Sequence, residues 1–171
     1  RGDVCLVPAT CARRARMAAG RQRAIEVGPP PNRSAFDVLV QVPGCWIWPN
    51  LGHVLKNWTQ WFPQLPLPRL PATFGLDPAG TIAELGSAVT GLKVGDRVYV
   101  NPGRSCGTCR ACRAGNPIGC TSMILQGYFG YSSTAQQTFD RYPFGGFCEY
   151  MVAPANGCVK LPDNVSCQQA A

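Results

Sequence analysis

Four cysteines within fifteen residues constrain this chain more than any other feature. They follow the spacing C-x2-C-x2-C-x7-C in the stretch CGTCRACRAGNPIGC and are Cys106, Cys109, Cys112 and Cys120. Zinc binds four thiolates as a tetrahedron, and a short glycine-rich loop can supply all four. Because protein then fills every position around the ion, neither water nor substrate can reach it. The spacing therefore predicts a structural rather than a catalytic zinc site.

Two other uses of these thiols stay open at the level of sequence. Four thiols can form two disulfides, although cysteines this close along a tight loop form strained bridges. A C-x2-C-x2-C run is also found in iron–sulfur proteins, where a fourth cysteine follows at a distance set by the family. The seven-residue gap before Cys120, with Arg110 and Arg113 inside the loop, fits zinc better.

Length and cysteine usage bound the class of protein. A chain of 171 residues is enough for one ordinary domain. It contains no run of eighteen apolar residues, so no membrane-spanning helix is expected. The other six cysteines are scattered without the paired spacing of a secreted disulfide framework. This usage predicts a reducing compartment, either the cytoplasm or an organelle matrix such as the mitochondrion.

Positive charge is concentrated at the start of the chain. Residues 1–33 hold seven arginines against Asp3 and Glu26, 7 − 2 = +5, whereas the other 138 residues contribute 9 − 7 = +2. We expect residues 1–24 to form a basic arm that lies against a protein partner. Contact with nucleic-acid phosphates is a weaker alternative, because this arm has no aromatic side chain to stack on bases.

Strand and turn signals dominate the remainder of the chain. One helix is expected within residues 4–20, an irregular proline-rich segment over 57–75, and a second helix from about Cys167 with Ser166 as its cap. Short strands bounded by glycine or proline are expected at 37–42, 80–86, 96–100, 146–152 and 158–161. Short strands in this arrangement predict a mainly β fold, a small barrel with few helices.

Three segments, in order, resemble one known family. They are VLVQVPGC, GLDPAGTIAELGSAVTGLKVGDRVYVNPGRSCGTCRACRAGNPIGC and GGFCEYMVAPANGCVKLPDNVSCQQAA. Residues 25–171 resemble the N-terminal, GroES-like domain of zinc-dependent medium-chain alcohol dehydrogenases. The resemblance implies a partly open β-barrel from which a structural-zinc lobe, about residues 103–122, protrudes. Family members continue into a Rossmann domain that binds NAD(P), but no G-x-G-x-x-G fingerprint follows a strand here, so we expect no such domain in this chain.

The catalytic metal site of the family is altered in this sequence. An ungapped comparison places Trp48 where the family has a zinc-binding cysteine, with Asn50 and Leu51 at the polar positions that follow. Cys45 lies three positions too early. The family's Gly-His-Glu, which supplies the second ligand, reads Gly75-Leu76-Asp77. Neither tryptophan nor leucine can coordinate zinc, so we expect no catalytic residue and no cofactor-binding residue in this chain.

Several other residues of this region are expected to have structural rather than catalytic roles. His53 matches the family's proton-relay position but is expected to be a packing or surface residue, and Asp77 a remnant that hydrogen-bonds locally. Four tryptophans are expected to fill the altered cleft or to form a docking surface: Trp46, Trp48, Trp58 and Trp61. The aromatic segment 121–144 either packs over the barrel as a satellite cluster or covers an entrance for a partner or substrate.

These observations favour a zinc-binding, alcohol-dehydrogenase-like domain with a degenerate catalytic site. We expect it to be a non-catalytic structural or accessory subunit that holds one structural Zn²⁺ and meets protein partners through its basic arm and its Trp/Tyr-rich surface. The alternative is a fragment or subunit of an NAD(P)-dependent zinc alcohol dehydrogenase. In that case NAD(P) would bind a nucleotide domain outside this chain.

Overall fold

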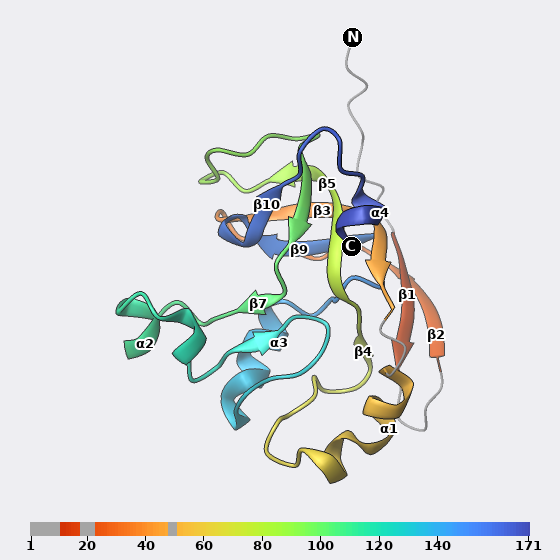
Figure 1. The fold of residues 1–171 in the computed structure, drawn as a ribbon, viewed down its shortest axis with the longest axis vertical. Helices are drawn as coiled ribbons and strands as arrows, with labels where there is room; N and C mark the ends of the chain where they lie inside the picture. Colours follow the sequence, from red (N-terminus) through yellow and green to blue (C-terminus); the bar gives the residue numbers. More distant parts are fainter. Residues whose placement is uncertain (1–10, 18–22, 48–50) are drawn as a thin grey trace.

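Strands make up most of the regular structure of this chain (Figure 1). The computed structural model describes residues 11–17, 23–47 and 51–171. The strands are β1 (Cys11–Met17), β2 (Arg23–Gly28), β3 (Asp37–Trp46), β4 (Ala72–Thr73), β5 (Leu76–Leu85), β6 (Arg97–Val100), β7 (Gly103–Arg104), β8 (Ile124–Leu125), β9 (Tyr150–Pro154) and β10 (Cys158–Lys160). The helices are α1 (Leu51–Trp61), α2 (Arg110–Arg113), α3 (Gln136–Arg141) and α4 (Cys167–Ala170), with 3-10 turns η1 (Pro117–Gly119), η2 (Ser133–Ala135) and η3 (Ala155–Gly157). The predicted fold class, mainly β with few short helices, is confirmed.

A five-stranded antiparallel sheet forms the body, in the order β10-β6-β5-β3-β9. Within the described residues its edge strands β10 and β9 are not paired with each other, so the sheet is open. Alternate side chains of a strand point to opposite faces. Val38 and Val40 of β3 accordingly enter one core cluster, with Ile82 and Met151, while Leu39 enters a second cluster with Val152. Both faces of β3 are therefore buried.

The helix predicted within residues 4–20 is wrong where the structure describes it. Residues 11–17 are strand β1, which pairs antiparallel with β2 from Cys11↔Gly28 to Met17↔Arg23. Its other edge pairs with β4 through Arg16↔Thr73 and Met17↔Ala72. The two partners satisfy backbone groups that a helix would have bonded internally, and this long-range pairing overrides the local helix signal.

Most of the other predicted elements are confirmed. Strand predictions at 37–42, 80–86, 96–100 and 158–161 are confirmed within one residue as parts of β3, β5, β6 and β10, whereas only residues 150–152 of the predicted strand 146–152 are extended. The irregular segment predicted over 57–75 begins later, because α1 continues to Trp61. The capped C-terminal helix is confirmed: the hydroxyl of Ser166 accepts a bond from the Gln169 N–H at 3.2 Å, and the Gln169 side chain accepts one from the Ser166 N–H at 2.9 Å.

Between β7 and β8 the chain leaves the body as a lobe that carries α2 and η1 (Figure 1). The strands β7 and β8 close its base through the pairs Gly103↔Leu125 and Arg104↔Ile124. No residue of α2 or η1 is buried. The lobe is thus attached through a short ladder, and its two helical turns contribute nothing to an apolar core.

No helix among the described residues is both long enough and apolar enough to cross a lipid bilayer.

Candidate metal centre

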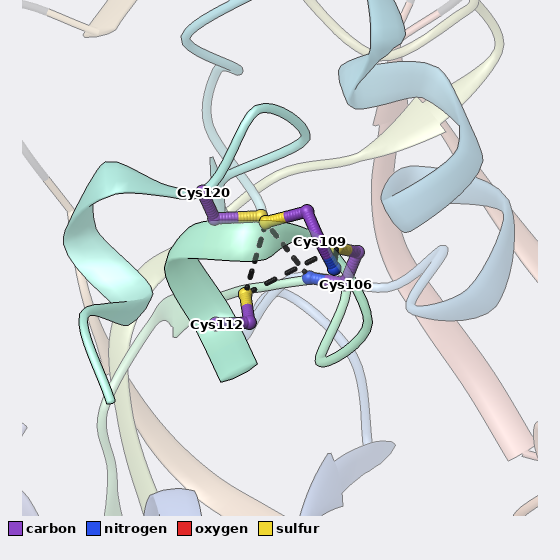
Figure 2. Close-up of side chains that lie close together, drawn as sticks. All are labelled: Cys106, Cys109, Cys112 and Cys120. Atoms are coloured by element: carbon purple, nitrogen blue, oxygen red, sulfur yellow. Dashed lines mark hydrogen bonds between the residues drawn. The ribbon is translucent and has the colours of Figure 1, made fainter. Parts of the chain in front are cut away.

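The structure brings the four lobe cysteines to one point (Figure 2). Their sulfur atoms all lie within 4.8 Å of one another. The Sγ–Sγ distance is 3.5 Å between Cys109 and Cys112 and 4.0 Å between Cys106 and Cys112. A tetrahedral zinc with Zn–S bonds of about 2.3 Å places its sulfur ligands roughly 3.8 Å apart. The thiols therefore have the spacing that a single tetrahedral ion requires.

The same distances weigh against the two alternatives. A disulfide needs sulfurs about 2.05 Å apart, and all four lobe cysteines are free. In a four-iron cluster each thiolate binds a different iron, which spreads the sulfurs further than around one ion. The donor set thus fits one soft divalent ion such as zinc.

The backbone around the cluster favours thiolates at two of the positions. N–H groups of Cys112 and Thr121 lower the pKa of the Cys109 thiol to about 6, and those of Thr108 and Cys109 lower the pKa of Cys106. Burial instead raises the pKa of Cys120 to about 11. A thiolate is the form that binds metal, so the loop backbone favours the metal-binding form of Cys106 and Cys109. For Cys120, a bound cation supplies the charge that removes its proton.

Part of the altered cleft falls outside what the structure describes. Trp48 and Asn50 lie in the undescribed segment 48–50, and the side chains of Leu51 and His53, at the start of α1, are likewise not described. The expectations for these residues stay predictions. Of the positions that the resemblance assigns to the catalytic site, the structure describes Leu76 and Asp77, at the start of β5, together with the nearby Cys45, at the end of β3.

Cys45 is engaged as a neutral thiol. Its Sγ donates a hydrogen bond to the carbonyl oxygen of Leu76 at 3.0 Å. Burial, reinforced by the nearby Asp77 carboxylate, raises the pKa of Cys45 to about 12. The thiol is thus protonated and bonded to the backbone in this structure. Among the described residues, no group of three or more His, Cys, Asp or Glu donors includes Cys45.

Asp77 is bound within the protein as well. Its Oδ1 accepts a hydrogen bond from the Tyr99 hydroxyl at 2.7 Å, which agrees with the hydrogen-bonding role predicted for Asp77. Burial, followed by this bond, raises the pKa of Tyr99. Sequence analysis did not identify Tyr99 because the contact joins positions 22 residues apart. Asp77 also has a positive φ of 53°, which aspartate tolerates better than most residues.

Close backbone packing fills the space beside Cys45. The Gly146 N–H donates to the Gly75 carbonyl at 2.8 Å, and the Gly75 N–H donates to the Gly127 carbonyl at 3.1 Å. A Cβ atom added to Gly146 would overlap the Cys45 sulfur and lie 2.8 Å from the Cβ of Pro78. Only glycine permits this approach, so main chain lies directly against the Cys45 thiol.

The aromatic residues divide into buried and exposed groups. Trp58 is buried against Phe62, Tyr128 and Phe129, with ring centroids 4.9, 5.7 and 4.7 Å away, and its Nε1 donates to the Leu65 carbonyl at 2.5 Å. These contacts join α1 to the segment after β8, as in the satellite-cluster interpretation of residues 121–144. Trp46 and Trp61 are instead exposed, at 56% and 52%.

The sequence also matches a known protein family. The family described as the alcohol dehydrogenase GroES-like domain matches residues 34–163, most of the chain. The chain therefore belongs to the alcohol dehydrogenase GroES-like domain family, which confirms the resemblance.

Individual relatives agree with this assignment. The chain is 35% identical to the L-threonine 3-dehydrogenase of Legionella pneumophila strain Corby over 143 residues, 84% of this chain and 37% of the relative. It is 34% identical to the D-xylulose reductase A of Aspergillus oryzae over 142 residues, 83% of this chain and 36% of the relative. A solved structure described as a short chain alcohol dehydrogenase of Escherichia coli CFT073, in complex with NADH, superimposes with a TM-score of 0.70 at 28% identity, over 95% of this chain and 42% of that one.

The chain covers only part of these proteins. It spans between a quarter and two fifths of the length of the curated relatives it matches. The match therefore concerns one domain of each relative.

We predict that Gly146→Ala destabilises the protein, because the new methyl group overlaps the Cys45 thiol. Overpacking of this kind costs about 1–3 kcal/mol of unfolding free energy, which urea denaturation measures. Gly52→Ala is the control: a Cβ at this helical glycine meets nothing within 4 Å and should stabilise α1 by up to about 1 kcal/mol. An unfolding free energy of the Gly146 variant equal to that of the wild type would contradict the packing described.

Proposed function

We propose that this chain is a zinc-braced, alcohol-dehydrogenase-like domain that does not itself hold a catalytic metal, and that it serves as a structural or accessory part of a larger assembly. The proposal rests on how the described residues near the family's catalytic-site positions are engaged. The Leu76 side chain offers no ligand atom, the Cys45 thiol donates a hydrogen bond to the Leu76 carbonyl, and Asp77 accepts one from the Tyr99 hydroxyl. A catalytic zinc needs three protein ligands with an open fourth position.

The lobe itself supports a bracing role for zinc. Its two helical turns bury no side chain, so apolar packing there does little to offset the entropy of ordering the loop. Binding of a structural zinc contributes roughly 10–16 kcal/mol in small zinc-finger peptides, and that energy is coupled to folding. Four sulfur atoms within 4.8 Å of one another give the ion its complete ligand shell.

The assembly is proposed to include a protein partner. Trp46 and Ile47 are adjacent, apolar and exposed, at 56% and 70%. Aromatic and large apolar side chains are enriched at the centres of protein interfaces. These residues and the basic arm predicted at residues 1–24 are the proposed contact regions.

A second candidate is that the chain forms part of an NAD(P)-dependent dehydrogenase. The observation in its favour is that its relatives are named as dehydrogenases and reductases of roughly two and a half to four times the matched length. In that protein a nucleotide-binding domain outside this sequence would bind the cofactor, and this chain would supply the zinc-braced domain alone.

We predict that Cys109→Ser lowers both zinc content and thermal stability. A hydroxyl is a much weaker zinc ligand than a thiolate, and a loss of even ~2 kcal/mol lowers the Tm of a domain this size by roughly 4–8 °C. The matched control is Cys158→Ser, outside the cluster, where the residue packs against the core and its thiol lies 3.7 Å from the Pro154 carbonyl. The control should keep its zinc, as measured by metal analysis. A Cys109 variant that melts like the wild type would rule out the bracing role.

The accessory and dehydrogenase proposals differ in the natural protein that contains these residues. We expect that protein, purified from its source, to hold one zinc per copy of this domain and to form no NAD(P)H from alcohols. Metal analysis and the absorbance of NAD(P)H measure the two quantities. NAD(P)H formation with one zinc would favour the dehydrogenase proposal. A second zinc per domain would contradict the degenerate cleft.

A further inference from the structure

A cavity lies between the base of the lobe and the part of the sheet where β3 begins and β9 ends. Its volume is about 770 Å³, within the range of roughly 300–1,000 Å³ that is usual for small-molecule sites. Its wall includes Arg104 of β7, Arg141 at the end of α3, and the turn Asn156–Gly157. None of these residues belongs to the cleft around Cys45.

Arg104 is a buried cation held in one orientation. Arg104 is only 2% exposed. The Nε donates to the Gln126 amide oxygen at 2.6 Å, and the Nη1 donates to the carbonyls of Asn101 and Gly103. The Nη2 is buried and has no hydrogen-bond partner among the described residues. Buried guanidinium N–H groups are normally bonded, so the geometry indicates an acceptor that the chain itself does not supply.

Nearby carboxylates do not supply that acceptor. Asp37 is the acidic residue in the cavity wall, but its Oδ2 accepts from the Ser34 N–H at 3.0 Å and its Oδ1 from the Tyr142 hydroxyl at 3.1 Å. No carboxylate oxygen of a described residue lies within 4.0 Å of the Arg104 guanidinium. Asp37 therefore leaves Arg104 without a direct ionic partner.

Arg141 adds a second cation to the same wall. Its Nη2 lies 3.9 Å from Asp37 Oδ1, a loose ion pair, and half of its side chain is exposed. The guanidinium carbons of Arg104 and Arg141 lie 5.7 and 5.1 Å from the centre of the Tyr142 ring. Both arginines therefore make a cation–π contact with the same ring. The wall holds two arginines against one aspartate, 2 − 1 = +1, before the charge of Cys106, which also lines the cavity, is counted.

We propose that this cavity binds a small molecule through an oxyanion, either a carboxylate or a phosphate, held by Arg104 and Arg141. A guanidinium presents N–H groups in a planar fork that matches both oxyanions. The fixed Arg104 is the anchor, and the exposed Arg141 closes on the ligand from the rim. This site shares no residue with Cys45, Leu76 and Asp77, but it rests on the zinc-bracing part of the function proposed above, because Cys106 of the lobe also lines the cavity.

The test is a calorimetric titration of the zinc-loaded 171-residue chain. Sodium phosphate and sodium acetate are titrated separately at constant ionic strength. We expect saturable binding of at least one of them. Phosphate alone identifies a phosphate site, acetate alone a carboxylate site, and binding of both an oxyanion site of broad selectivity.

Variants separate the cavity from general electrostatic attraction. Arg141→Gln should weaken binding about tenfold or more, because it removes a charge-assisted hydrogen bond. Arg69→Gln removes the same charge from an exposed arginine outside the cavity wall and should leave binding unchanged. Arg104→Gln should abolish binding while circular dichroism shows a folded chain; if it does not fold, the Arg141 and Arg69 variants decide. Absence of saturable binding, or equal weakening by the Arg141 and Arg69 variants, overturns the proposal.

Discussion

The antiparallel pairing of β3 with β5 is the contact on which both sites of this domain depend. The pairing of the two strands runs from Val38↔Leu85 to Trp46↔Leu76. One end of this ladder places Cys45 beside Leu76 and Asp77. The next strand in the sheet, β6, leads through β7 into the lobe. Because valines and isoleucine from β3, β5 and β6 share one buried core, the position of the lobe and the state of the cleft are set by the same packing.

Two regions of the domain differ in how their donor groups are engaged. In the lobe, apolar burial is absent from α2 and η1, four sulfur atoms converge, and backbone N–H groups favour thiolates at Cys106 and Cys109. In the cleft, main chain and side chains satisfy one another: the thiol of Cys45 bonds to Leu76, and the phenol of Tyr99 bonds to Asp77. The first region brings four sulfur donors together, whereas no group of three or more such donors occurs in the described part of the second. The scaffold of the family is thus retained, while we propose that its metal chemistry is not.

The features that could be predicted are those that depend on residues close together in the sequence. The cysteine spacing placed the metal cluster, short strand-forming runs beside glycine or proline turns placed β3 and β6, and Ser166 placed the start of α4. Contacts between distant residues could not be predicted. The strand at Cys11–Met17 forms because β2 and β4 pair with it, and the thiol of Cys45 is enclosed by Gly146, about a hundred residues later. The buried Arg104 likewise becomes informative only when Asn101, Gly103 and Gln126 are seen to leave one of its nitrogens unbonded.

X-ray absorption spectroscopy at the zinc edge tests the central claim most directly, because it reports the atoms bound to the metal in the folded protein. The account predicts a single zinc environment of four sulfur atoms at about 2.3 Å, with no nitrogen or oxygen ligand. A shell containing nitrogen or oxygen, or a second zinc environment in the same protein, would contradict it. Such a result would show that a metal is held outside the four thiols of the lobe.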